Sequence, residues 1–262
     1  MKLKISCLQM DIAFGDPNNN YQSAERLIEK AQSDKPDIIV LPELWTTGYD
    51  LTRLDEIADD HALQTINFLQ EAAKTYQVNF VGGSVANREE SGIKNTLLII
   101  NKDGKLVHQY SKLHLFKLMD EHVYLEAGNE KGIFQLEDNK FAGAICYDIR
   151  FPEWIRVHSA AGAEALFVVA EWPLQRLSHW RALLIARAIE NQCYVIACNR
   201  SGQDPNNQFA GHSLIIDPWG EVVSEAGTSE QILSAEIDIN LVKEVRRQIP
   251  IFADRKPEYY KY

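Results

Sequence analysis

Three side chains in this sequence have the chemistry to carry out one hydrolytic reaction. Cys146 follows the apolar run FAGAI and precedes a polar turn, a position from which a thiol can attack a carbonyl carbon. Glu43 ends the run IIVLPE, where its carboxylate could pass protons, and Lys112 in YSKLHLF could supply a fixed cation to an oxyanion. Together, a thiol, a carboxylate and an ammonium group form a coherent set for hydrolysing a carboxamide.

Each of these residues also has an ordinary structural interpretation. Cys146 could be a buried core cysteine, Glu43 a solvated loop glutamate, and Lys112 a side chain whose stem lies on an apolar surface. A cysteine–histidine hydrolase would instead need a histidine beside the thiol. The candidates for that histidine are His114, His122, His179 and His212.

The elements that must position these residues alternate between strands and helices. Apolar runs and period-2 patterns predict strands over residues 2–10, 37–43, 78–85, 165–172, 193–200 and 232–238. Helical patterns cover residues 19–33, 61–76, 178–192 and 239–248, and a further helix begins at Pro152. Hairpins are predicted over residues 95–110 (turning at Asp103-Gly104), over 132–146 (turning near Asp138-Asn139) and over 213–225. This mixture predicts one layered α/β domain over residues 1–262, with helices packed outside mixed sheets.

The junction that carries Cys146 suggests an activated thiol. A strand ends there and a helix starts within a few residues, so the thiol would lie near the partial positive charge of a helix N-terminus. Such a position favours the thiolate. Glu43, at the end of another buried run, would lie at the carboxyl edge of a sheet, where open α/β sheets place their sites.

The composition of the chain argues against several classes of binding partner. The net charge of −10 argues against nucleic acid, which needs a basic surface, but not against a small anion held by one arginine. No apolar run approaches the roughly 20 residues that span a membrane, and the first residues lack a signal-peptide pattern, so a cytoplasmic protein is expected. The four cysteines are scattered without metal-ligand spacing, which predicts free thiols and no zinc site.

The segments LPE, YSKLHLF and CYDIRFPE, in that order, resemble the three signature motifs of the nitrilase superfamily of carbon–nitrogen hydrolases. The resemblance continues through HWRALLIARAIENQCYVIACNR and GHSLIIDPWGE, so it covers nearly the whole chain. It implies a four-layer α-β-β-α sandwich. No metal or organic cofactor is expected, because the nucleophile, the acid–base group and the oxyanion donors are all protein groups. The resemblance also implies that Cys146 is the nucleophile, Glu43 the general base and acid, and Lys112, with the backbone N–H of Tyr147, the oxyanion donor.

Many members of this superfamily carry a second glutamate after the lysine motif. Glu121 in DEHVYLEAG fits that position best, and Glu126 is its rival. The resemblance implies that this carboxylate holds Lys112 and helps to orient the substrate.

Further stretches, including KLHLF followed by DEH, VAEWP and CNRSG, resemble the bacterial omega-amidase branch. That branch hydrolyses 2-oxoglutaramate and 2-oxosuccinamate, so small dicarboxylic acid monoamides and water are the expected reactants. Alternatives are an amidase for deaminated glutathione or a carbamoylated amine, and a non-catalytic binding or redox module.

A dicarboxylic acid monoamide needs a partner for its distal carboxylate. Arg150 and Arg176 are candidates, because the arginine fork suits a carboxylate, although Arg150 could instead be a structural ion-pair partner. Tyr49 and Trp172 could wall the pocket or simply pack.

The helix predicted over residues 178–192 carries two apolar stripes, because helical positions advance by about 100°. One stripe contains Trp180, Leu184 and Ala188, and the other contains Ala182, Ile185 and Ile189. A second apolar stripe on an outer helix predicts a homodimer interface. Alternatively, the C-terminal tail covers it within one chain, through Tyr259, Tyr260 and Tyr262.

Overall fold

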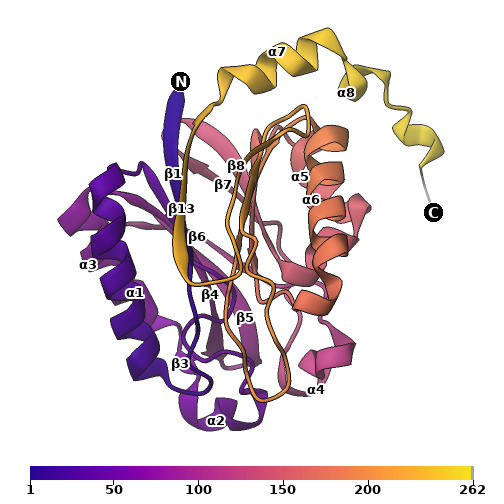
Figure 1. Cartoon of the computed structure of the whole chain (residues 1–262). Coiled ribbons are helices and arrows are strands. Elements are labelled where there is room, and N and C mark those ends of the chain that lie inside the picture. The colour runs from indigo at the N-terminus through magenta and orange to yellow at the C-terminus, as the bar shows by residue number, and fades with distance from the viewer. Residues whose placement is uncertain (261–262) are drawn as a thin grey trace.

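The computed structural model describes residues 1–260, in which two β-sheets pack face to face between pairs of helices (Figure 1). The first sheet has the spatial order β13 (Gln231–Asp238), β1 (Lys2–Gln9), β2 (Ile38–Val40), β4 (Asn79–Glu89), β5 (Gly92–Ile100) and β6 (Leu106–Ser111), with the short β3 (Asp59–Asp60) beside β4. The second sheet has the order β12 (Val222–Glu225), β11 (Leu214–Ile216), β10 (Tyr194–Asn199), β9 (Ala165–Ala170), β8 (Asn139–Ile145) and β7 (Ile133–Leu136).

Helices cover the outer face of each sheet. Helices α1 (Pro17–Ala31) and α3 (Leu63–Tyr76) pack on the first sheet, and α5 (Pro152–Ala160) and α6 (Leu177–Asn191) pack on the second. The remaining helices are α2 (Leu54–Ile57), α4 (Glu121–Tyr124), α7 (Asn240–Gln248) and α8 (Ile251–Asp254). The four-layer α-β-β-α sandwich implied by the sequence motifs is therefore confirmed. Within residues 1–260, no helix is both long and apolar enough to cross a bilayer.

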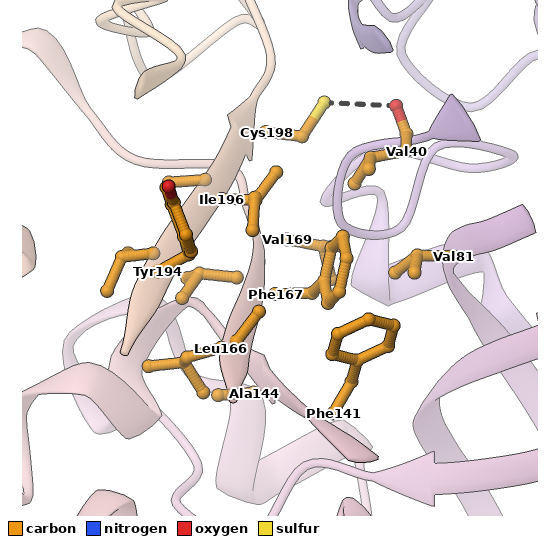
Figure 2. Packing of buried hydrophobic residues seen from close by; sticks show 14 of the residues in the cluster. Val40, Val81, Phe141, Ala144, Leu166, Phe167, Val169, Tyr194, Ile196 and Cys198 are labelled. Atoms are coloured by element: carbon orange, nitrogen blue, oxygen red, sulfur yellow. Dashed lines mark hydrogen bonds between the residues drawn. The ribbon is translucent and has the colours of Figure 1, made fainter. Parts of the chain in front are cut away.

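Strand alternation decides which side chains fill the space between the sheets. In β2, Ile38 and Val40 join the core between the two sheets, whereas Ile39 joins the core beneath α1 and α3. Phe141, Phe167 and Val169 of the second sheet pack toward Val40 and Val81 of the first (Figure 2). Because both faces of each sheet are covered, the strands read as nearly continuous apolar runs.

The predicted helices and strands are found, with ends that differ by a few residues. Helix α1 begins at Pro17 rather than Asn19, because the Asp16 side chain accepts a hydrogen bond from the Asn19 N–H and caps the helix. The sequence analysis missed β3, α2, α4 and α8, which are too short to show a period. It also ended the strand at 85, whereas β4 continues to Glu89 and pairs with β5.

A backbone irregularity in β4 shapes the loop that carries Glu43. The pairing of β4 with β5 shifts between Val81 and Ser84, and Gly83 there has a φ of 65°. A Cβ atom on Gly83 would lie 2.3 Å from the carbonyl oxygen of Pro42, so only glycine lets this loop approach. The loop is then fixed by hydrogen bonds from Leu44 N to Ser84 Oγ and from Trp45 Nε1 to the Gly82 carbonyl.

Candidate active site

The three chemically competent residues meet where strands from both sheets end. Glu43 lies shortly after β2, Lys112 directly after β6 and Cys146 directly after β8. Glu43 and Lys112 are completely buried, and Cys146 is 6% exposed. The Lys112 ammonium donates to Glu43 Oε1 at 2.8 Å and to Glu121 Oε1 at 2.6 Å. One buried cation therefore lies between two buried carboxylates.

Glu121, rather than Glu126, is the glutamate beside Lys112. Glu121 begins α4, is completely buried, and accepts a further hydrogen bond from the Phe116 N–H through Oε2. Glu126 is exposed, and its stem lies against Gly92. The sequence left this choice open, and the fold of the 116–121 loop decides it.

The Glu43 carboxylate is held at both oxygens. Oε1 accepts from Lys112, from Asn95 Nδ2 at 2.8 Å and from the Tyr49 hydroxyl at 3.0 Å. Oε2 accepts from the backbone N–H of Glu171 at 2.8 Å. The Tyr49 hydroxyl also lies 2.5 Å from Glu121 Oε1, so this residue bridges the two carboxylates instead of walling the pocket. These contacts fix one orientation of Glu43.

The thiol of Cys146 differs from the activated thiolate expected from the sequence. Burial raises its pKa well above the usual value, the nearby Glu43 and Glu121 carboxylates raise it further, and Lys112 lowers it. The expectation of a favoured thiolate was therefore wrong. Burial also acts to lower the pKa of Lys112, but the Glu121 and Glu43 charges outweigh it and raise that pKa above its usual range, so the ammonium stays charged.

The backbone at the thiol has an uncommon conformation. Cys146 has a φ of 43°, in the left-handed region, and begins a five-residue 3₁₀ turn, Cys146–Arg150, that leads into α5. A non-glycine residue in this region costs on the order of 1–3 kcal/mol and persists only where neighbouring contacts hold it. The sharp strand-to-helix turn predicted around Cys146 is thus present.

A narrow pocket opens onto the thiol. Its lining consists of Phe116, Met119, Cys146, Tyr147, Arg150, Glu171, Trp172, Pro173 and Arg176. It therefore brings together every substrate-binding candidate except Tyr49. Arg150 contacts the Trp172 ring, with 4.7 Å from the guanidinium carbon to the ring centroid, and its Nη2 lies 3.4 Å from His179 Nδ1. Within residues 1–260 no carboxylate pairs with Arg150, so it is not the structural ion-pair partner considered from the sequence.

None of the four candidate histidines is placed to act as a base for the Cys146 thiol. The His114 Nδ1 lies 2.7 Å from Asp148, and His212 Nδ1 lies 2.8 Å from Glu225. His179 faces Arg150, and His122 is exposed. The nearest titratable partner of the Cys146 thiol is the Glu43 carboxylate, whose charge raises the thiol pKa. Across residues 1–260, no group of three or more His, Cys, Asp or Glu side chains is arranged to hold a metal ion.

Two residues in the site escaped the sequence analysis. Asn95 holds Glu43 and also accepts the Lys112 N–H at its backbone carbonyl, but a single asparagine at a strand start gave no signal. Glu171, in the run VAEWP, was a visible acidic residue at a strand end. Its Oε2 accepts from Arg200 Nη1 at 3.0 Å, while its buried Oε1 has no hydrogen-bond partner among residues 1–260.

Comparisons with known proteins agree with this geometry. Residues 4–247 match the carbon-nitrogen hydrolase family, and the chain belongs to this family of enzymes, which hydrolyse carbon–nitrogen bonds other than peptide bonds. It is 56% identical to the 2-oxoglutaramate amidase of Bacillus subtilis over 260 residues, 99% of this chain and 100% of that protein. It is 37% identical to the omega-amidase YafV of Escherichia coli K12, covering 96% of each chain. A CN-hydrolase superfamily protein of Xanthomonas campestris, solved with an arsenic adduct in its active site, aligns with a TM-score of 0.92 at 32% identity, covering 98% of each chain.

Glu171 should make the stability of the protein depend on pH. Burial raises its pKa from 4.5 to about 8, with Arg200 opposing the shift, so across this range the folded state holds a proton that the unfolded state has lost. The contribution of Glu171 to the free energy of unfolding therefore falls as the pH rises from about 5 to about 8. In Glu171→Gln this fall should be shallower, measured by urea unfolding at several pH values.

The matched control for this experiment is Glu71→Gln, which removes a carboxylate that is 75% exposed on α3. It should keep the wild-type pH dependence. The same pH dependence in Glu171→Gln and the wild type would contradict the raised pKa of Glu171.

Proposed function

We propose that this chain is an omega-amidase, which hydrolyses the terminal amide of a small dicarboxylic acid monoamide, such as 2-oxoglutaramate or 2-oxosuccinamate, to the acid and ammonia. The identity of 56% to a 2-oxoglutaramate amidase over the full length of both chains carries the substrate class. The buried cluster of Cys146, Lys112 and two glutamates supports a cysteine-dependent mechanism. Residues 1–262 act as one carbon–nitrogen hydrolase domain in this proposal.

The first half of the reaction forms a thioester. The raised pKa of Cys146 leaves the resting thiol protonated at neutral pH, so it needs a base as it attacks the amide carbon, and Glu43 takes this proton. The oxyanion of the tetrahedral intermediate is stabilised by the Lys112 ammonium and the backbone N–H of Tyr147. Glu43 then gives its proton to the departing nitrogen, the carbon–nitrogen bond breaks, and ammonia leaves.

The second half consumes the thioester. Water attacks the acyl carbon while Glu43 accepts one of its protons, and the same donors stabilise the second oxyanion. The carbon–sulfur bond then breaks, the Cys146 sulfur regains the proton, and the free acid leaves. Glu121 and Tyr49 keep Lys112 and Glu43 in place through both halves.

Glu43→Gln should retain its fold and lose most of its activity. General acid–base groups contribute typically about 10²–10⁴-fold, so turnover of 2-oxoglutaramate should fall by that order, measured as ammonia release. Cys146→Ala should release no ammonia above background. Glu126→Gln, which changes an exposed glutamate, serves as the control and should retain wild-type turnover. Near-normal turnover in Glu43→Gln would remove Glu43 from the mechanism, and faster turnover of other amides would redirect the substrate assignment.

The distal carboxylate of the substrate is read by arginine in this proposal. Arg150 and Arg176 both line the pocket, at positions where their guanidinium groups lie over the rings of Trp172 and Phe116. Trp172 itself is 2% exposed, and its Nε1 donates to the Arg176 carbonyl, which fixes the indole as a wall. A carboxylate in this pocket would meet planar donors already oriented by aromatic rings.

Replacing either arginine should affect charged and neutral substrates differently. In Arg150→Gln or Arg176→Gln, the KM for 2-oxoglutaramate should rise about tenfold or more, because a charge-assisted hydrogen bond is lost. The KM for an uncharged amide of similar length, such as valeramide, should change little. The control is Arg181→Gln on α6, which breaks an ion pair with Glu225 of β12 and should change neither KM value. Equal effects on both substrates would show that the arginines do not read the carboxylate.

The protein is also a cytoplasmic homodimer in this proposal. On α6, Trp180, Leu184 and Ala188 are buried, whereas Ala182 is exposed and Ile189 is 52% exposed. The tail runs past α5 instead of covering this stripe: residues 251–260 form one wall of a groove whose other wall is mainly α5. Tyr259 and Tyr260 are 80% and 52% exposed, and Tyr262 lies outside the described residues. The four buried, unpaired cysteines suit a reducing compartment.

Light scattering at micromolar concentration should give twice the chain mass of 29.8 kDa. Ile189→Arg should shift the mass toward one chain, because it places a charge on the exposed stripe of α6. Leu63→Arg changes an equally exposed residue on α3, outside the other sheet, and should leave the mass unchanged. A wild-type mass near 29.8 kDa would contradict the homodimer.

A further inference from the structure

The carboxylate of Asp148 is completely buried two residues after Cys146 and has four hydrogen-bonding contacts. Its Oδ1 accepts from the His114 N–H at 3.1 Å and lies 2.7 Å from His114 Nδ1. Its Oδ2 accepts from the Tyr110 hydroxyl at 2.7 Å and from the Ile145 N–H at 3.0 Å. Both oxygens are therefore fully used within the protein, and none of these contacts belongs to the Glu43–Lys112–Glu121 cluster.

These contacts come from the two segments that carry reactive groups. Tyr110 and His114 lie two residues before and two residues after Lys112, so one carboxylate holds both sides of the lysine. Ile145 directly precedes Cys146 and ends β8. Asp148 thus joins the lysine segment of the first sheet to the cysteine turn of the second. Helix α5 adds to this connection, because Trp154 Nε1 donates to the Tyr110 hydroxyl at 3.1 Å.

The contacts of Asp148 also support the left-handed backbone conformation of Cys146. The Ile145 N–H···Oδ2 bond spans Cys146, whose left-handed φ of 43° needs support from its surroundings. The His114 ring, held by Asp148, stacks on Phe151 with 3.7 Å between ring centroids, which closes the far side of the turn. The conformation of Cys146 therefore depends on a residue that does not line the pocket.

We propose that Asp148 is a positioning residue for the reaction, which fixes the Cys146 sulfur relative to Lys112 and Glu43. This inference rests on the proposed amidase function. The physical reason is that a reacting atom misplaced by about 1 Å can cost on the order of 10²-fold in rate, even when the substrate still binds. The residues that line the pocket do not include Asp148, so substrate binding should change little when Asp148 is altered.

The test is Asp148→Asn, which keeps the shape of the side chain but replaces one acceptor oxygen by an NH₂ group, so that a donor faces donors of the protein. The kcat for 2-oxoglutaramate, per folded molecule, should fall about 10²-fold, while the KM should stay within about threefold of the wild type. The alkylation of Cys146 by iodoacetamide, followed by mass spectrometry, should be about tenfold slower, because the thiol no longer faces its base. Alkylation needs no amide substrate, so this arm still tests Asp148 if the wild type fails to hydrolyse 2-oxoglutaramate.

Ser159→Ala is the matched control, since it removes a buried hydroxyl bonded to Asn191 between α5 and α6, away from the turn. It should lower the melting temperature without changing kcat. If Asp148→Asn does not fold, Tyr110→Phe and His114→Leu each remove part of the connection and should lower kcat severalfold at constant KM. The proposal is overturned by a folded Asp148→Asn with kcat within threefold of the wild type, by an equal loss of kcat in Ser159→Ala, or by wild-type kcat in both partial variants.

Discussion

The site depends on one buried charge, the Lys112 ammonium held between the carboxylates of Glu43 and Glu121. An ammonium group without partners in this interior would lose its proton, whereas two carboxylates at hydrogen-bonding distance keep it charged. The same arrangement leaves a net negative cluster beside Cys146, which disfavours a further anion, the Cys146 thiolate. The cation therefore does not produce a resting thiolate. In the proposed mechanism, the ammonium instead stabilises the negative charge that develops on the substrate oxygen.

This charge balance explains the chemistry expected of the thiol. Catalytic cysteines in many enzymes are activated by a lowered pKa, but burial and neighbouring carboxylates raise the pKa of Cys146. In the proposed mechanism, attack by the thiol is therefore coupled to proton transfer to Glu43. In this mechanism Glu43 accepts that proton and returns it to the leaving nitrogen, which requires a fixed orientation. Four donors from separate parts of the chain fix the Glu43 carboxylate.

The sandwich brings those donors to Glu43 because strands of both sheets end beside the Glu43 carboxylate. Residues 43, 112, 146 and 171 each lie at or just beyond the end of a strand, in β2, β6, β8 and β9. The apolar core between the sheets fixes the distance between them, and the Gly83 irregularity lets the Glu43 loop approach. Asp148 then joins the two sheets next to the reacting atoms. A rigid scaffold thus holds a site in which Glu43, Lys112 and Glu121 each have defined partners.

The sequence by itself determined the layered α/β sandwich, the candidate set Glu43, Lys112 and Cys146, and the apolar stripes of the helix after Trp172. These depend on local order: period-2 and helical patterns, and short motifs whose residues lie together in the chain. Only the tertiary structure decided that Glu121 rather than Glu126 faces Lys112, that Tyr49 bridges two carboxylates, and that the thiol has a raised pKa. Lys112 and Glu121 are only 9 positions apart, but the path of the loop between them, and not their spacing, selects Glu121. The other properties depend on burial and on contacts between residues up to 128 positions apart, such as Tyr49 with Glu121 and Glu43 with the Glu171 N–H, and no short segment of sequence encodes these.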